Sequence, residues 1–138
     1  MIEYVCGFAF SPDTLEVALI EKAKPEWQRG QWNGIGGKIE PGETPNEAMA
    51  REFAEETTLS IPVTHWEPFA VITGPDYRVY FFRALNEPIR HCVTATDERV
   101  QRWAVDALPD KMIANLRFLI PLALQSHGYG LVRFEAKS

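Results

Sequence analysis

Apolar runs separated by turn-forming residues predict several short strands in the first part of the chain. Residues 4–10 form one such run, and the turn signal at 11–13 (Ser-Pro-Asp) separates it from a second run at 15–20. Because turn residues between two apolar runs are typical of a hairpin, we expect these two strands to pair with each other. The polar stretch 22–33, which contains a proline and a glycine, predicts a long loop.

The second half of the chain shows the same kind of pattern. Residues 66–73 and 77–85 are rich in β-branched and aromatic side chains, and Gly74-Pro75-Asp76 lies between them, which predicts a hairpin. Shorter runs at 100–105 and 131–134 predict two further strands.

A helix is predicted from Pro45 to about Thr57. Thr44 can cap its free N–H groups, Pro45 suits the first helical position, and Glu47 completes a capping box. Two adjacent threonines, which are β-branched, weaken the helix where it ends.

A second helix is predicted over 110–125, where apolar residues recur at helical spacing. Pro121 lies inside it and should kink it, and Gly128 is a natural C-cap. Strands, a helix, more strands and a second helix, in that order, predict an α+β protein with helices covering a sheet.

Composition narrows the class of protein. A chain of 138 residues, 46% hydrophobic and 24% charged, fits a single domain over 1–138. The net charge of -5 argues against a nucleic-acid polymer as partner, since such partners need a basic surface. No signal peptide or membrane span is visible. Cys6 and Cys92 do not form a CxxC motif and are interpreted as free thiols. We therefore expect a cytoplasmic protein with no membrane partner.

Three glutamates of the first predicted helix share one face. At about 100° per residue, Glu52, Glu55 and Glu56 fall within a face about 100° wide. Like charges at this spacing destabilise a helix, and carboxylates near its C-terminus oppose the helix dipole. A solvated acidic face is one interpretation. A site for a hard divalent cation, which prefers carboxylate oxygens, is the other.

The residues around this face resemble the Nudix box, G-x5-E-x7-R-E-U-x-E-E-x-G-U, in which U is a bulky apolar residue. The matching positions are Gly37, Glu43, Arg51, Glu52, Phe53, Glu55, Glu56 and Leu59. Thr58 stands where the box has its last glycine, so we expect a slightly altered helix exit and intact chemistry. Fixed spacing over this many positions is a specific signal.

The resemblance implies a Nudix-type α/β/α sandwich with a mixed central sheet, and it implies roles for individual residues. Mg²⁺, or Mn²⁺, would be held by Glu52, Glu55, Glu56 and the Gly36 carbonyl. Arg51 would pair with Glu43 or a neighbouring glutamate and hold the helix face in register. Lys38 would contact substrate phosphate. A later acidic residue assists catalysis in many family members, and we favour Glu98 over Asp97 for that role.

The resemblance also implies the reaction, which is metal-dependent hydrolysis of a phosphoanhydride bond in a nucleoside diphosphate derivative. The loop around Asn33 resembles that of the branch that acts on oxidised purine nucleoside triphosphates, and Asn115 aligns with a base-reading residue there. Either asparagine can equally have a structural role. A pyrophosphatase for ADP-ribose, a nucleotide sugar or a dinucleotide is the alternative substrate class, and a non-catalytic nucleotide sensor is the alternative class of protein. Family members are often dimers, and for this chain we expect a monomer or a homodimer.

Overall fold

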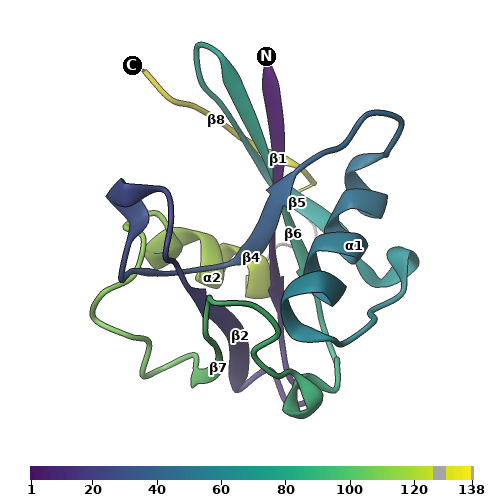
Figure 1. The fold of residues 1–138 in the computed structure, drawn as a ribbon, viewed down its shortest axis with the longest axis vertical. Coiled ribbons are helices and arrows are strands. Elements are labelled where there is room, and N and C mark those ends of the chain that lie inside the picture. Colours follow the sequence, from purple (N-terminus) through teal and green to yellow (C-terminus); the bar gives the residue numbers. More distant parts are fainter. Residues whose placement is uncertain (126–129, 138) are drawn as a thin grey trace.

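The computed structural model describes residues 1–125 and 130–137. Its larger sheet is mixed and has five strands in the order β4-β1-β6-β5-β8, and a smaller sheet has the order β3-β2-β7 (Figure 1). The strands are β1 (Ile2–Ala9), β2 (Glu16–Glu21), β3 (Trp32–Asn33), β4 (Ile35–Lys38), β5 (Glu67–Thr73), β6 (Tyr77–Ala84), β7 (Val100–Ala104) and β8 (Val132–Glu135). The helices are α1 (Pro45–Thr57) and α2 (Leu116–Gln125), with 3-10 turns η1 (Glu26–Gln28), η2 (Val63–His65) and η3 (Ile89–His91).

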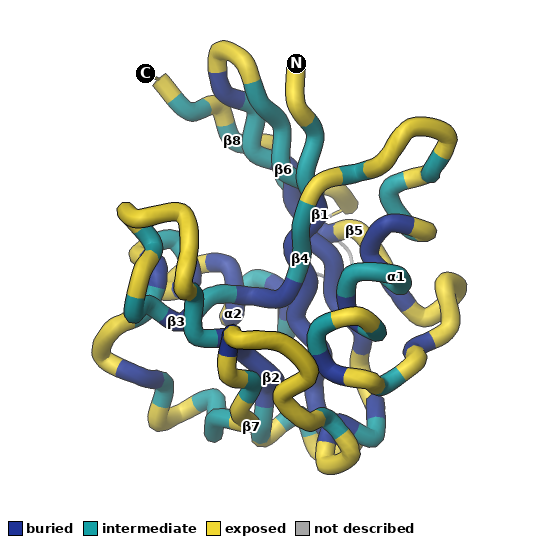
Figure 2. Tube along the Cα trace, viewed as in Figure 1, coloured by how far each residue is buried: buried dark blue, intermediate teal, exposed yellow. Residues whose placement is uncertain are grey.

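The helices cover opposite faces of the five-stranded sheet, which confirms the predicted α+β sandwich. Phe8 and Phe81 belong to a core cluster with Leu119 of α2. A second cluster, with α1, contains Val5 of β1 and Phe82 of β6, whose side chains point to the other face of the sheet. This division follows from the alternation of side chains along a strand. Figure 2 shows the buried positions gathered in the middle of the molecule, between α1 and α2.

The predicted hairpin between residues 4–10 and 15–20 is wrong. β1 pairs with β4 in antiparallel orientation and with β6 in parallel orientation, while β2 pairs with β3 and β7. An isolated bridge between Phe10 and Val17 joins the ends of the two segments. Residues 5–10 are buried without interruption, as expected of a central strand with both faces covered, whereas one strand of an exposed hairpin would alternate.

The strand β4 was not predicted, because its sequence Ile-Gly-Gly-Lys has the composition of a loop. Gly36 lies opposite Cys6 of β1, and a Cβ added at Gly36 would collide with the main-chain carbonyl of Val5. The glycine is therefore required by the close approach of two strands. Residues 39–44 follow this strand and lead to α1.

The helix α1 has the predicted bounds and cap. The Thr44 hydroxyl accepts a hydrogen bond from the Glu47 N–H, and the Glu47 carboxylate accepts one from the Thr44 N–H. Thr58 adopts the left-handed conformation with φ of 65°, and its N–H donates to the Ala54 carbonyl. The expected alteration of the helix exit is therefore wrong, because Thr58 takes the conformation that a glycine would take there.

The second helix begins at Leu116, six residues later than the predicted start at Asp110. The preceding segment is instead tied to β3: the Trp32 N–H donates to the Lys111 carbonyl, and the Ile113 N–H donates to the Trp32 carbonyl. Pro121 lies inside the helix as predicted, and Gly128 lies outside the described residues. Within residues 1–125 and 130–137, no helix is both long and apolar enough to cross a membrane.

Candidate active site

The side chain of Arg51 organises the carboxylates of α1. Its Nε donates to Glu43 at 2.6 Å and its Nη2 donates to the same carboxylate at 2.9 Å. Its Nη1 donates to Glu52 at 2.9 Å and to Glu55 at 3.3 Å, and Nη2 also donates to the Lys38 carbonyl at 3.1 Å. The predicted pairing of Arg51 with Glu43 or a neighbouring glutamate is confirmed for both. One guanidinium thus joins α1, the loop before it and the end of β4.

The pKa values of these carboxylates are shifted in different directions. The hydrogen bond from Arg51 lowers the pKa of Glu43 to about 2. Burial raises the pKa of Glu52, and this effect outweighs the opposing hydrogen bond from Arg51. Burial also raises the pKa of Glu56, against a hydrogen bond from Thr96 that lowers it. The charges of Glu98 and Glu55 add to the rise in the pKa of Glu56, and the charge of Lys22 opposes it.

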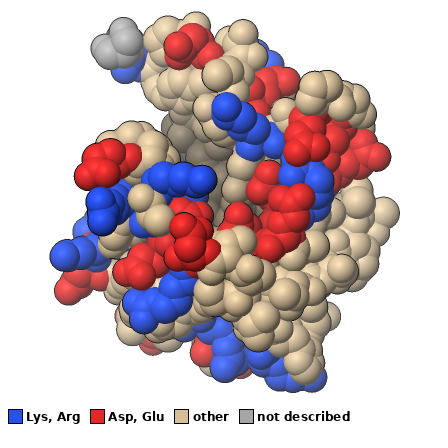
Figure 3. Space-filling model, in the orientation of Figure 1, with Lys and Arg blue, Asp and Glu red and all other residues tan. Residues whose placement is uncertain are grey.

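Figure 3 shows the surface of this region, where acidic side chains gather around a few basic ones. Glu52 lies against β4 only because residue 37 is glycine: a Cβ there would stand 2.6 Å from the Glu52 carboxyl carbon. The side chain of Glu55 is 55% exposed, while that of Glu52 is 13% exposed. The two carboxylates therefore reach solvent to different extents.

The donor chemistry of this cluster fits a hard divalent cation, because it supplies several carboxylate oxygens. Their present orientation is not that of a formed site. Among the described residues, no three His, Cys, Asp or Glu side chains converge so that they could hold a metal ion. Glu52 and Glu55 turn toward Arg51, and Glu56 turns toward Thr96. Metal binding would require these carboxylates to exchange such contacts for the cation.

The segment that carries Glu98 lies beside the C-terminal end of α1. The Glu98 side chain is buried and accepts hydrogen bonds from the Ala23 N–H at 2.6 Å and from Lys22 Nζ at 3.2 Å. Asp97 is exposed. Of the two acids, only Glu98 is thus held in a fixed position, by the loop that follows β2. Lys22 was missed from sequence, because a lysine in a polar loop carries no signal of its own.

The two asparagines predicted to read a base are placed differently. Asn33, at the end of β3, is held by its neighbours: its Nδ2 donates to Gln28 at 3.0 Å, and its Oδ1 accepts from the Gly34 N–H at 2.8 Å and from the Cys6 thiol at 3.8 Å. Asn115 precedes α2, and its Oδ1 is buried with no hydrogen-bond partner among the described residues. A buried amide oxygen without a partner is unfavourable unless a ligand or water supplies a donor. The main-chain hydrogen bonds between Trp32 and residues 111–113 bring together the segment that carries Asn33 and the segment that leads to Asn115.

Lys38, the predicted phosphate contact, is exposed at the end of β4. Its ammonium group makes no ion pair with the part of the chain that the structure describes.

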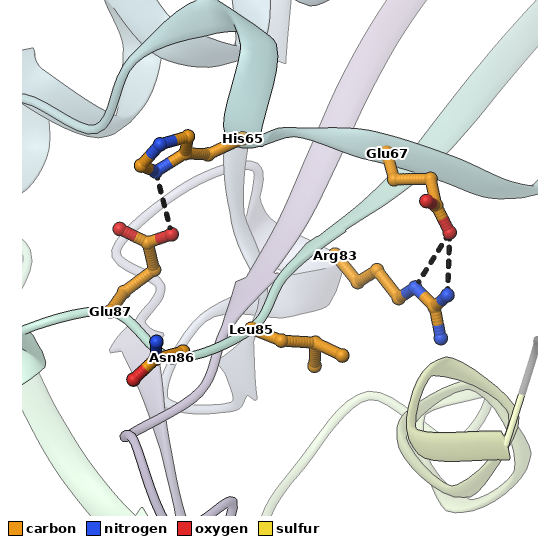
Figure 4. A pocket seen from close by; sticks show the side chains of 6 residues that line it. All are labelled: His65, Glu67, Arg83, Leu85, Asn86 and Glu87. Carbon is orange, nitrogen blue, oxygen red and sulfur yellow. Dashed lines mark hydrogen bonds and ion pairs between the residues drawn. The ribbon is translucent and has the colours of Figure 1, made fainter.

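Away from this cluster, a hollow of about 330 Å³ lies where β5 begins and β6 ends, and its lining is drawn in Figure 4. His65 Nδ1 lies 3.0 Å from the carboxylate of the buried Glu87. Arg83, also buried, donates through Nε and Nη2 to Glu67 and through Nη1 to the Ala123 carbonyl. Each charged group here has a partner, and Arg83 ties the last turn of α2 to the sheet.

The comparisons with known proteins agree with this geometry. A family model described as NUDIX domain matches residues 4–122. A zebrafish (Danio rerio) protein named oxidized purine nucleoside triphosphate hydrolase is 32% identical over 127 residues, which are 85% of this chain and 78% of that protein. The human 8-oxo-dGDP phosphatase NUDT18 is 39% identical over 85 residues, which are 59% of this chain and 24% of that longer protein.

Solved structures share the fold at low sequence identity. A MutT protein from Bacillus halodurans superposes with a TM-score of 0.75 at 18% identity, covering 99% of this chain and 90% of that one. The Nudix domain of NrtR from Shewanella oneidensis, in complex with ADP ribose, has a TM-score of 0.73 at 18% identity, covering 91% and 87%.

Proposed function

The chain belongs to the Nudix hydrolase family, and from this membership we propose that it cleaves a phosphoanhydride bond in a nucleoside diphosphate derivative. Enzymes of this family use divalent metal ions, and here we propose Mg²⁺, with Mn²⁺ as a substitute. The favoured substrate is a nucleoside triphosphate, in particular one with an oxidised purine, and the products are a nucleoside monophosphate and pyrophosphate. The observation that supports this most strongly is the cluster of α1 carboxylates around Arg51.

The metal would be held by Glu52, Glu55, Glu56 and the Gly36 carbonyl. Bound there, a divalent cation supplies positive charge that neutralises the phosphate oxygens and lowers the barrier to attack by water. Arg51 fixes α1 against the preceding loop through Glu43, which keeps the helix face that carries the glutamates in register. The ammonium group of Lys38 would bind a phosphate of the substrate.

Proton transfer falls to the glutamates of this site. Glu55 is the more exposed of the carboxylates that Arg51 contacts on α1, so water reaches its carboxylate. An Oε atom that neither Arg51 nor the metal holds would accept the proton of the attacking water. Glu98 is proposed to assist from the opposite side of the cluster, where Lys22 and the Ala23 N–H keep its carboxylate in place. Arg51 keeps its charge throughout, since its hydrogen bond to Glu43 raises its pKa further.

We assign recognition of the base to Asn33 and Asn115. The unpartnered Oδ1 of Asn115 supports this, because a donor on a purine edge would satisfy it. The name of the zebrafish relative supports an oxidised purine as the base. ADP-ribose, a nucleotide sugar or a dinucleotide is the second candidate, and the complex of the NrtR domain with ADP ribose shows that a domain of this fold can bind such a molecule.

We further propose that residues 1–138 form one domain that acts in the cytoplasm as a monomer or homodimer on a small nucleotide, and that it neither binds a nucleic-acid polymer nor associates with a membrane. The two core clusters lie on the two faces of one sheet, which supports a single domain. The free thiols of Cys6 and Cys92 suit a reducing compartment.

A release assay with identified products tests the proposal. The protein is incubated with Mg²⁺ and a panel of ordinary and 8-oxo-purine triphosphates, ADP-ribose, a nucleotide sugar and a dinucleotide. We expect monophosphate and pyrophosphate, with the largest kcat/KM for an oxidised purine triphosphate. Release from ADP-ribose alone would move the substrate to the second candidate. Binding of nucleotides without any product would identify a sensor and overturn the hydrolase assignment.

The same panel tests the base-reading residues. Asn33→Ala and Asn115→Ala should each reduce the preference among bases by more than they reduce turnover of a poor substrate. Equal losses on every nucleotide would instead assign the residue a structural role.

A further inference from the structure

The segment 93–98 is docked onto the C-terminal end of α1 by its main chain. The Val93 N–H donates to the Thr57 carbonyl at 3.1 Å, and the Ala95 N–H donates to the Glu56 carbonyl at 3.3 Å. Both carbonyls belong to the last turn of the helix, where acceptors have no partner within the helix itself. The segment therefore has a fixed position relative to the last carboxylate of α1.

Thr96 follows directly and makes two hydrogen bonds through a single atom. Its Oγ1 donates to Glu56 Oε2 at 3.0 Å and accepts from the Glu98 N–H at 3.1 Å. A hydroxyl has one donor and can still accept, which is what this position requires. One oxygen thus connects a carboxylate of α1 with the main chain of the residue that carries the other acid.

Glu98 continues this connection to the far side of the cluster. Its buried carboxylate binds the Ala23 N–H and the Lys22 ammonium group. The charges of Glu56 and Glu98 repel each other, and no side-chain hydrogen bond from the described residues of α1 keeps the Glu56 carboxylate in one orientation. A donor fixed from outside α1 can do so.

We propose that Thr96 is a positioning residue for the hydrolytic site, which holds the Glu56 carboxylate and the main chain of Glu98 in register through its hydroxyl group. This inference rests on the proposed function, because it assigns Glu56 and Glu98 to that site. Groups that orient metal ligands typically change affinity or activity by about 10–100-fold when removed. Because Thr96 itself need not touch substrate, we expect an effect at the lower end of that range.

Three variants separate positioning from a merely structural role. Thr96→Val removes the hydroxyl at similar volume, and Thr96→Ser retains it. Thr94→Val is the matched control, because the Thr94 hydroxyl lies in the same segment and accepts from the Val100 N–H without reaching a carboxylate. For each variant we would measure kcat and KM on the best nucleotide of the panel, the affinity for Mn²⁺ alone by electron paramagnetic resonance, and stability in urea.

We expect Thr96→Val to lower kcat about tenfold with KM within about twofold, and to weaken Mn²⁺ binding several-fold. Thr96→Ser should restore both values to near those of the parent, and Thr94→Val should change neither. Parent-like kcat and Mn²⁺ affinity in Thr96→Val would overturn the inference, as would equal losses in Thr94→Val or failure of Thr96→Ser to restore them.

Failure of the proposed function would look different. A parent protein that binds Mn²⁺ but releases no product would contradict the hydrolase, and the Mn²⁺ affinities of the variants would still decide the role of Thr96. A parent protein that neither binds Mn²⁺ nor releases product would overturn both proposals.

Discussion

Arg51 and Arg83 both bind carboxylates, but they differ in how many negative charges surround each guanidinium group. Arg83 is buried, binds the single carboxylate of Glu67 and donates a further hydrogen bond to the Ala123 carbonyl. Arg51 is shared among Glu43, Glu52 and Glu55, and the carboxylate of Glu56 lies on the same helix face without any share of it. The first arrangement closes the end of a helix, whereas the second leaves negative charge uncompensated.

This difference separates a stabilising site from a functional one. A sequence selected only for folding avoids several like charges on one helix face, because they lower helix stability and oppose the dipole. Such local conflicts are expected where function requires them. At the hollow beside β5 and β6 no conflict of this kind is found among the described residues, since His65 is paired with Glu87 and Arg83 with Glu67. Substitutions in the two regions should therefore give opposite results.

The largest contrast is expected between two Glu→Gln changes. Glu55→Gln should lower kcat at least about 100-fold, because it removes a carboxylate that holds the metal or accepts a proton. It should leave the fold intact, since the charge that it removes repels its neighbours. Glu67→Gln is the control in the other region and should leave kcat unchanged while lowering the melting temperature. Steady-state kinetics and thermal unfolding measure both, and full activity in Glu55→Gln would remove that residue from the site.

Arg83→Met should lower the free energy of unfolding by about 2 kcal/mol, because the Ala123 carbonyl loses its donor in a buried position. Since Glu67 can be solvated, its loss of a partner adds little. Activity per folded molecule should be retained. Urea unfolding gives the stability, and a large fall in kcat without a loss of stability would show that the hollow takes part in the reaction.

The pH dependence of stability should differ between carboxylates of the first region. The pKa of Glu43 in the folded protein is about 2, below the ordinary value of 4.5, so its ionised form stabilises the fold above about pH 4.5. This contribution is lost as the pH falls through about 2. Glu43→Gln should therefore be less stable than the parent at pH 7, and the two should converge in acid. Urea unfolding across this pH range tests it, and a deficit that does not change with pH would contradict the ionic origin.

For Glu52 the pH dependence of stability has the opposite sign. Burial raises the pKa of Glu52 in the folded protein above its ordinary value, so ionisation of this carboxyl as the pH rises lowers stability. Glu52→Gln should therefore raise metal-free stability at pH 7 relative to the parent, with the advantage shrinking as the pH falls and the parent becomes protonated. A variant that is less stable than the parent at pH 7 would show that the bond to Arg51 outweighs burial.

The smallest effect is expected at the exit of α1. Thr58→Gly should raise the free energy of unfolding by no more than about 1 kcal/mol, because glycine adopts a φ of 65° without the steric cost of a side chain. The chemistry should be unchanged. A loss of stability on urea unfolding would show that the Thr58 side chain contributes a contact that compensates for its conformation.

The elements that could be predicted from sequence are those with local causes. The cap of α1 depends on residues Thr44 to Glu47, and the shared face of the glutamates depends on helical spacing, so both were predicted. The partners of β1 could not be, because β4 and β6 lie far along the chain and a turn at 11–13 suggested a nearer partner. The strand β4 was hidden by glycines that the contact with β1 requires.

For the site, too, sequence predicts only the residues whose roles have local causes. Arg51 and the glutamates follow from fixed spacing within one segment. Thr96 and Lys22 gave no signal, because their roles arise only when the 93–98 segment docks between α1 and the loop after β2. The late start of α2 has a similar cause, since main-chain hydrogen bonds to Trp32 hold residues 111–113 out of the helix.

The central claim, that a divalent cation relieves the charge around Arg51, is tested most directly by the free energy of unfolding in urea as Mg²⁺ is added. The account predicts a rise in the parent protein that follows binding to the folded state, about 2.7 kcal/mol at a concentration 100 times the Kd. Arg83→Met should show the same rise, whereas Glu52→Gln and Glu55→Gln should show much less. An absence of any rise at millimolar Mg²⁺, or an equal rise in all four proteins, would contradict it.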